Sequence, residues 1–272
     1  MRSRLALLAI LCVGTVLMKP VAAPAVTIEP SKPAIRRGNQ WFLRNTLTTG
    51  QSDITFAYGS ASDFPLFGDW DGNGSKTPGV VRGNVWYLRN SNSAGNADLV
   101  FTYGSVGDIP YAGDWDNDGD ETPGVVRGGG NCQKVGDEIH CVLKQTDWFL
   151  RNANSSGVSN VSFTTPCPCG RVIPTIGDWD ATAGDDPGYR PLFFANRFFL
   201  DTGKDYDFET LLRFGVSNTD FPISGDWDAD GADGIGVVRG NVWYLRNTLT
   251  DGTHEASFTY GSADDRWFLV WR

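Results

Sequence analysis

The sequence predicts an all-β fold, a β-propeller built from four-stranded blades, and three observations support this prediction. The string PGVVRGNVWYLRN at residues 78–90 is echoed by PAIRRGNQWFLRN at 33–45 and by GIGVVRGNVWYLRN at 234–247. A second string, GDWD, recurs with a unit length of roughly 45 residues. Short segments rich in β-branched and aromatic residues separate these strings, and no sustained helical period is present. The aromatic residue of the first string falls at Trp41, Trp86, Trp148, Phe198 and Trp243.

The beginning of the chain resembles a secretory signal peptide. Arg2 and Arg4 precede an apolar run at residues 5–18, and the small-residue stretch VAAPA follows. The run is too short to span a bilayer comfortably. We therefore expect residues 1–25 to be a signal peptide, residues 26–272 to form a single secreted, extracellular domain without a membrane span, and the mature chain to be a monomer.

The charge of the predicted mature chain argues against nucleic acid as a partner. Loss of the three basic residues of the signal peptide changes the formal net charge from −9 to −12. A phosphate backbone is repelled by such a surface.

Each repeat contains four predicted strands, represented by the strings IPYAGDW, PGVVR, VWYLR and ADLVFTYG. Residues 85–88 are apolar at consecutive positions, which indicates a strand that is buried on both faces. Sheets that stack face to face around an axis bury their strands in this way. We therefore interpret each repeat as one propeller blade.

The number of blades follows from the positions of the GDWD strings. Four blades begin near Phe64, Ile109, Ile173 and Phe221, while residues 33–59 supply only three strands of another. The C-terminal segment 266–272 is placed to supply the missing inner strand, which would close a five-bladed ring and remove exposed sheet edges. The alternatives are truncation or a frame change in a longer parent gene, and a solenoid of short calcium-binding turns, which a 45-residue period fits poorly.

An acidic turn follows each GDW string. The four turns read DWDGNGSKT from Asp69, DWDNDGDET from Asp114, DWDATAGDD from Asp178 and DWDADGADG from Asp226. Oxygen atoms at positions one, three and five of a tight loop converge on one point, and a glycine at position six permits the reversal. This arrangement suits a hard cation, with the tryptophan at position two packed between blades. The alternative is that Asp and Gly are simply the residues that turns favour.

These loops resemble the FG-GAP, or integrin-like, calcium repeats, which are grouped with the VCBS-type repeats of bacterial secreted proteins and have a pattern near DxDxDGxxD. The resemblance covers most of the predicted mature chain and implies a structural, weakly bound Ca²⁺, with a dissociation constant on the order of 10⁻⁴ to 10⁻³ M. The loops depart from the pattern at Asn73, at Thr182, and at position nine, where Thr77, Thr122 and Gly234 stand in the first, second and last loops. The expected metal ligands are Asp69, Asp71, Asn73 and Thr77; Asp114, Asp116, Asp118 and Thr122; Asp178, Asp180, Thr182 and Asp186; and Asp226, Asp228 and Asp230.

Four cysteines remain in the predicted mature chain, and in an oxidising compartment they favour disulfides over a metal cluster. Cys132 and Cys141 lie in an insertion at 128–144, after the second strand of its blade. Cys167 and Cys169 lie in the turn after the fourth strand of the same blade. A Cys167–Cys169 bridge is cramped, so we expect two bridges between the insertion and the turn, with a local Cys132–Cys141 pair as the alternative. The insertion is a candidate partner-binding projection.

The sequence offers little for catalysis. The two histidines, His140 and His254, are poor candidates for a catalytic base, and no cofactor-binding fingerprint is present. Aspartates recur just before the inner strands, where we interpret them as turn-forming residues, with the WYLRN arginines as their partners. These aspartates are Asp63, Asp108, Asp220 and Asp265, and these arginines are Arg44, Arg89, Arg151 and Arg246.

The leading hypothesis is therefore a non-catalytic, calcium-stabilised binding or interaction module, with an extracellular protein or glycan as its partner. The first alternative is a lectin-like, carbohydrate-binding propeller with one pocket per blade. The second alternative is a five-bladed glycoside hydrolase, which requires two unlike carboxylates at a set separation.

Overall fold

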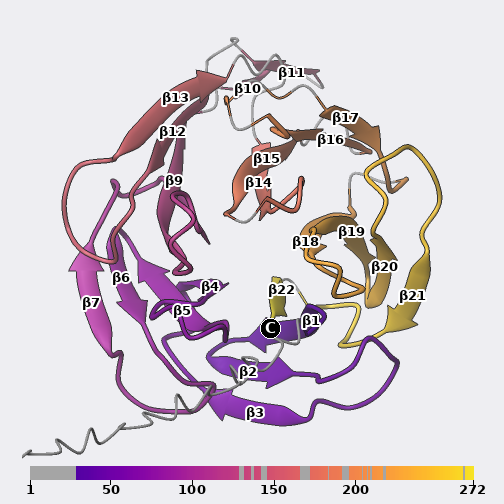
Figure 1. Cartoon of the computed structure of the whole chain (residues 1–272), viewed down its shortest axis with the longest axis horizontal. Coiled ribbons are helices and arrows are strands. Elements are labelled where there is room, and N and C mark those ends of the chain that lie inside the picture. The colour runs from indigo at the N-terminus through magenta and orange to yellow at the C-terminus, as the bar shows by residue number, and fades with distance from the viewer. Residues whose placement is uncertain are drawn as a thin grey trace, which may run out of the picture.

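The chain folds into a closed ring of five four-stranded antiparallel sheets, as the computed structural model shows (Figure 1). The predicted signal peptide at 1–25 lies outside the residues that the structure describes. Those residues are 29–128, 132–135, 138–141, 146–165, 172–182, 184–191, 196–203, 205–206, 208, 210–216, 219–265 and 267–272. The predicted all-β, five-bladed propeller is confirmed.

The blades are numbered in chain order, and their strands run from the axis outward. Blade I comprises β22 (Trp267–Trp271), β1 (Lys32–Arg37), β2 (Gln40–Leu43) and β3 (Ile54–Ala57). Blade II comprises β4 (Phe64–Gly68), β5 (Thr77–Arg82), β6 (Val85–Leu88) and β7 (Leu99–Thr102). Blade III comprises β8 (Ile109–Gly113), β9 (Thr122–Gly128), β12 (Thr146–Leu150) and β13 (Val161–Thr165). Blade IV comprises β14 (Val172–Gly177), β15 (Asp186–Pro191), β16 (Arg197–Leu200) and β17 (Thr210–Arg213). Blade V comprises β18 (Phe221–Gly225), β19 (Gly234–Arg239), β20 (Val242–Arg246) and β21 (Ala256–Thr259).

The ring closes through blade I, which combines strands from both ends of the described chain. Strand β22 pairs antiparallel with β1, in a register that sets Lys32 opposite Trp271 and Arg36 opposite Trp267. Strand β22 also contacts the inner strands of its two neighbours, β4 and β18. Ring closure by the C-terminal segment, as predicted, is therefore confirmed.

The core lies between the blades and is organised by the repeated aromatic residue of the third strand. The side chains of Trp41, Trp86, Trp148 and Trp243 are fully buried, and so is that of Phe198 in blade IV. Each tryptophan stacks on a phenylalanine of the fourth strand, as Trp86 does on Phe101. The indole N–H of Trp86 donates to the Tyr103 carbonyl, so this large side chain is buried without an unsatisfied donor.

The glycine of GDWD is required by the tryptophan that follows it. A Cβ atom on Gly68 would lie 2.5 Å from the Trp70 ring, and a Cβ atom on Gly79 would lie 2.9 Å from the same ring. Trp70 therefore covers two glycines of its own blade, and it belongs to a core cluster that includes Val125 of blade III. This agrees with the predicted packing of the motif tryptophan between blades.

The inner strands carry prolines at Pro65, Pro110 and Pro222. A proline cannot donate a ladder hydrogen bond, so it fits a strand with one edge unpaired. The inner strand of each blade has such an edge, which faces the axis of the ring.

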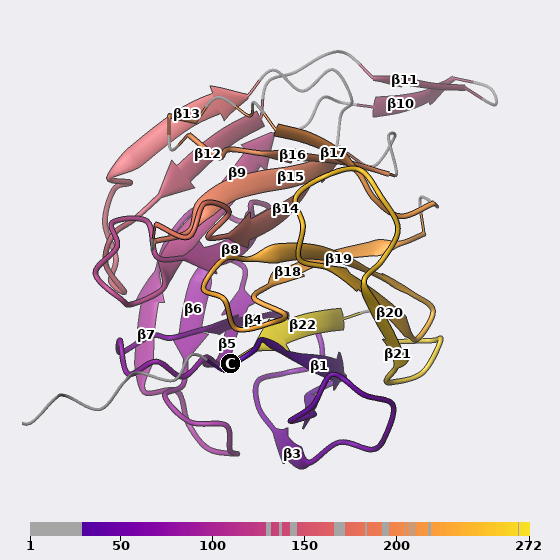
Figure 2. The ribbon, with the colours of Figure 1, turned by 45° about the vertical axis from the view of Figure 1, so that its right-hand side comes forward.

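The insertion at 128–144 contributes a separate two-stranded ladder outside the five blades. Strands β10 (Cys132–Val135) and β11 (Glu138–Cys141) pair antiparallel, with the backbone of Cys132 opposite that of Cys141. The ladder projects beyond the ring (Figure 2). Cys167 and Cys169 lie outside the described residues, so the expected bridges remain predictions. Within the described parts of the chain, no helix has the length and apolarity needed to cross a bilayer.

Candidate functional site

The acidic loops connect the first and second strands of blades II to V and share one face of the ring, which we call the acidic face. Each loop is organised by its first aspartate. In the blade III loop, the carboxylate of Asp114 accepts hydrogen bonds from the backbone N–H groups of Asp118 and Gly119, at 3.1 and 3.0 Å. The carboxylate of Asp226 accepts equivalent bonds from Asp230 and Gly231. The loop conformation is therefore held by its own side chains.

The fourth position of every loop adopts a left-handed backbone. The φ angle is 67° at Gly72, 60° at Asn117, 57° at Ala181 and 63° at Ala229. Alanine rarely adopts such angles, because its Cβ then crowds the backbone. The loop geometry therefore dominates over the local preference of Ala181 and Ala229.

Two loops bring three carboxylates together. Ligand atoms of Asp114, Asp116 and Asp118 lie within 4.8 Å of one another, and those of Asp226, Asp228 and Asp230 do the same. In both loops the second and third aspartates are exposed. Carboxylate oxygens at this spacing are the ligand set of a hard cation. The predicted convergence of positions one, three and five is therefore confirmed for these two loops.

Three aspartates of these two loops have a pKa above that of an ordinary aspartate. Burial raises the pKa of Asp114, and burial followed by the charges of Asp230 and Asp226 raises that of Asp228. Burial and the adjacent Asp118 carboxylate raise the pKa of Asp120 to about 7. Like charges that are crowded in this way are relieved by a proton or by a bound cation.

The other two loops supply fewer carboxylates. In the blade II loop, Asn73 takes the third slot, and its side-chain oxygen accepts a hydrogen bond from the Ser75 N–H. In the blade IV loop, the hydroxyl of Thr182 donates to Asp180, at 2.6 Å. A left-handed glycine also stands at position six of the other three loops, at Gly74, Gly119 and Gly231, and in the blade IV loop it stands one position later, at Gly184.

The predicted ninth-position ligands lie at the start of the second strands. Thr77 and Thr122 are buried, and their hydroxyls donate to the carbonyls of Gly68 and Gly113, both at 3.3 Å. Asp186 is buried at the first residue of β15.

The eighth loop position links neighbouring blades, a role that the sequence alone did not indicate. The Asp185 carboxylate of blade IV accepts a hydrogen bond from the Asp114 N–H of blade III, and the Asp185 N–H donates back to the Asp114 carbonyl. We call such a reciprocal pair a latch. Three further latches have the same pattern of one backbone and one side-chain hydrogen bond. They join Asp69 to Glu121, Asp178 to Asp233 and Asp226 to Ser31. Between blades I and II the backbone N–H of Lys76 donates to the Arg272 carbonyl.

Alignment of the repeats provides the signal for this position, because a polar residue directly precedes every second strand: Ser31, Lys76, Glu121, Asp185 and Asp233. The Lys76 ammonium lies 2.6 Å from the Glu121 carboxylate. Burial opposes ionisation of Lys76, but Glu121, Asp185 and Asp233 more than offset it and raise the pKa of this lysine. Burial also raises the pKa of Asp185 to about 6 and that of Asp233 to about 7, although Lys76 lowers both.

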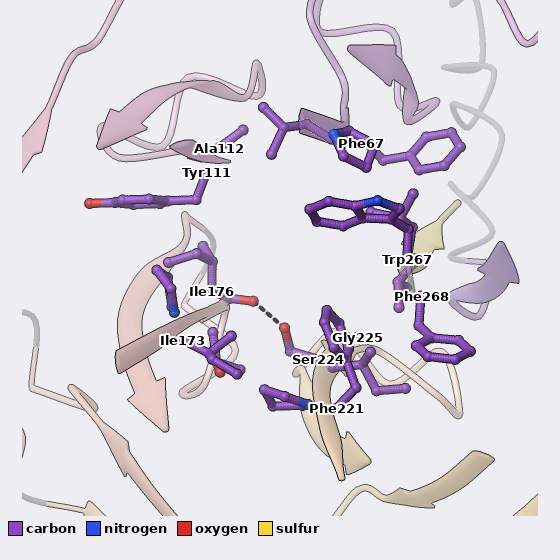
Figure 3. Close-up of a pocket in the computed structure, with 18 of the residues that line it drawn as sticks. Phe67, Tyr111, Ala112, Ile173, Ile176, Phe221, Ser224, Gly225, Trp267 and Phe268 are labelled. Atoms are coloured by element: carbon purple, nitrogen blue, oxygen red, sulfur yellow. Dashed lines mark hydrogen bonds between the residues drawn. The ribbon is translucent and has the colours of Figure 1, made fainter. Parts of the chain in front are cut away.

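An axial cavity of about 460 Å³ lies between the inner strands of the five blades (Figure 3). The labelled side chains of Phe67, Tyr111, Ile173, Phe221 and Trp267 surround one open space. Lys76 and Asp233 line both this cavity and a wider hollow of the acidic face, of about 630 Å³, so the two spaces meet at these side chains.

The opposite face, which we call the arginine face, carries one paired aspartate in each of blades I, II, III and V. Both oxygens of the Asp63 carboxylate accept hydrogen bonds from Arg82, at 2.8 and 2.9 Å, and the Ser60 N–H donates to the same group. Burial raises the pKa of Asp63, but Arg82 and Ser60 outweigh it and hold the pKa below its usual value. The equivalent pairs are Asp108–Arg127, Asp220–Arg239 and Asp265–Arg37.

The turn-forming role predicted for these aspartates is confirmed, but the arginines predicted as their partners are the wrong ones. Arg44 instead donates to the carbonyls of Thr48 and Gln51, at 2.6 Å each, and so holds its own β2–β3 loop. Arg89, Arg151 and Arg246 hold the equivalent loops.

No protein-family model, curated protein or solved structure matches the chain.

Proposed function

We propose that the protein is a secreted, calcium-stabilised propeller that acts as a non-catalytic interaction module, with loops of the FG-GAP or VCBS type. The observation that carries the proposal is the pair of aspartate triads on the acidic face, with their oxygens within 4.8 Å of one another. The triads stand on loops whose conformation is held by the first aspartate, so the ligand atoms are positioned before a cation binds.

Calcium in such a loop stabilises more than the loop itself. Asp114 is both a triad member and one half of the latch to Asp185 in blade IV. Asp226 is likewise a triad member and is latched to Ser31 of blade I. A cation that fixes either loop therefore also fixes the contact between two blades, which suits a scaffold that presents a rigid surface.

Thermal unfolding with and without calcium tests the proposal. At a calcium concentration about ten times the dissociation constant, each site adds ~1.4 kcal/mol to the stability of the folded state. This corresponds to a rise in Tm of roughly 3–5 °C per site. We expect the rise to halve in Asp116→Ala, to disappear in the double variant Asp116→Ala/Asp228→Ala, and to return to baseline when EGTA is added.

The matched control is Asp264→Ala, which removes an exposed aspartate on the arginine face. This variant should respond to calcium as the unmodified protein does. The calcium proposal fails if millimolar calcium does not raise the Tm of the unmodified protein. It also fails if calcium raises the Tm of the double variant by the same amount as that of the unmodified protein.

The partner is an extracellular protein or glycan, and the insertion at 128–144 is the proposed contact. Its β10–β11 ladder belongs to none of the five blades and projects beyond the ring. Replacement of residues 128–144 by the short Gly83–Asn84 turn of blade II should preserve the Tm and abolish partner binding.

Two other outcomes would favour the alternative functions. Glycan-array binding that survives this replacement and falls when the equivalent aromatic residues of each blade are substituted would favour the lectin-like alternative. Hydrolysis of a polysaccharide panel that is lost when Asp63, Asp108, Asp220 and Asp265 become Asn would favour a glycoside hydrolase.

A further inference from the structure

The axial cavity has an apolar wall along the whole length of the inner strands. Five residues of a strand, such as Phe64–Gly68, span roughly 13 Å from first to last Cα. Side chains along this path include Leu66, Ile176, Ile223 and Leu269. A volume of about 460 Å³ is within the range of cavities that hold small organic ligands.

The two ends of the cavity differ in chemistry. At the arginine face, half-buried apolar side chains stand at the beginning of the inner strands, and Phe64 and Trp267 meet there edge to face with 4.9 Å between ring centroids. At the acidic face the cavity ends at Lys76 and Asp233. A ligand with an apolar body and one polar end group matches this asymmetry.

The sign of the polar end group follows from the charges around the acidic hollow. Seven carboxylates and three cationic side chains line it. All three cations are already paired: Lys76 with Glu121 at 2.6 Å, Arg272 with Asp226 at 3.4 Å and Lys32 with Glu29 at 3.7 Å. Asp185 and Asp233 therefore share Lys76 with Glu121, and the site has an excess of negative charge.

The position-eight carboxylates differ from the triads in their spacing. Among the described residues, only the two loop triads bring three acidic ligand atoms within 4.8 Å of one another, so a shared metal ion is disfavoured at this end of the cavity.

The cavity wall also holds a polar group without a hydrogen-bond partner among the described residues. It is the hydroxyl of Thr175, a residue that is 4% exposed and lines the cavity.

From this geometry we infer that the axial cavity binds a small organic cation, an aliphatic or aromatic amine. Its apolar body lies between the inner strands, and its ammonium group lies beside Asp233 and Asp185. Asp185 and Asp233 stand at the eighth position of their loops, outside the two aspartate triads, and binding of the amine does not require calcium.

Calorimetric titration with three ligands of equal chain length tests the charge preference: octylammonium, 1-octanol and octanoate. The titrations are run in EGTA, so that failure of the calcium proposal leaves the result readable. We expect one octylammonium ion per chain, about tenfold weaker binding of 1-octanol, and still weaker binding of octanoate. Equal binding of the three, or tighter binding of octanoate, overturns the inference.

Two substitutions at the polar end should act in opposite directions. Asp233→Asn removes the charge and retains an oxygen that can accept the latch bond from Asp178, so octylammonium should bind roughly fivefold more weakly. Lys76→Met removes the competing cation and retains the backbone hydrogen bond to the Arg272 carbonyl, so octylammonium should bind roughly fivefold more tightly.

The control Asp264→Asn should leave the affinity unchanged, because this exposed residue lies outside the cavity. Trp267→Ala, at the apolar end, should weaken the binding of octylammonium and 1-octanol alike. If Asp233→Asn and Lys76→Met both leave octylammonium affinity unaltered, the ammonium does not lie at this end and the inference fails.

Discussion

The two faces of the propeller use a repeated aspartate in opposite ways. On the arginine face, Asp63 is fully buried and both of its oxygens meet one guanidinium. On the acidic face, Asp228 is exposed, and its neighbours Asp226 and Asp230 are also acidic. The residue type is the same on both faces, but on the arginine face a neighbouring arginine pairs with the carboxylate of Asp63. The carboxylate of Asp228, which has acidic neighbours, is left available to a ligand from solution.

The largest effect is expected on the arginine face. Asp63→Ala removes both hydrogen bonds from Arg82 and the bond from the Ser60 N–H. We expect the free energy of unfolding to fall by ~2 kcal/mol, because a buried turn loses its acceptor and a guanidinium loses its partner. Urea denaturation measures the change, with Asp264→Ala as the control. A loss no larger than that of the control would mean that the two faces do not differ in this respect.

A smaller effect follows from protonation of the same group, which removes the charge but keeps the side chain. The pKa of Asp63 is lower in the folded protein than the 3.8 of an ordinary aspartate. Its contribution to stability is therefore complete above about pH 4 and is lost as the pH falls through the folded-state pKa. Below pH 4, the free energy of unfolding should fall less steeply with decreasing pH for Asp63→Asn than for the unmodified protein. If the two proteins lose stability in parallel, the ionised Asp63 carboxylate does not stabilise the fold.

The smallest effect is expected on the acidic face and has the opposite sign. In calcium-free buffer, Asp228→Asn removes one of three crowded like charges, so the free energy of unfolding should rise by ~0.5 kcal/mol. With calcium present the same variant should be less stable than the unmodified protein. Asp180→Asn, in the loop where Thr182 replaces the third acid, should change neither value measurably. A loss of stability in Asp228→Asn without calcium would erase the contrast between the faces.

Much of this architecture could be predicted from the sequence because it repeats along the chain. The repeated unit around Trp86 predicts four strands in each blade. The C-terminal segment 266–272 matches an inner strand that one unit lacks. The convergence of Asp114, Asp116 and Asp118 follows from spacing within one loop, which is local information.

Contacts between units were harder to predict. The latch between Asp114 and Asp185 joins residues that become neighbours only when two blades pack together. The wrong partner for Asp63 has a different cause, because Asp63 and Arg82 belong to the same repeat. Arg44 and Arg82 are both repeat arginines, but Arg82 ends the second strand, beside the start of the inner strand, whereas Arg44 follows the third strand and holds its loop.

The pairing of β1 with β22 also orders the events of folding. Blades II to V each consist of one continuous stretch of chain, so their strands can pair soon after they are synthesised. Blade I cannot be completed until Trp267–Trp271 reaches Lys32–Arg37, from the far end of the sequence. Contacts between such distant segments are slow to form, because a long loop must close first. Until that last pairing forms, the edge of β1 that β22 covers stays open, which makes the half-closed ring the stage of folding most exposed to aggregation.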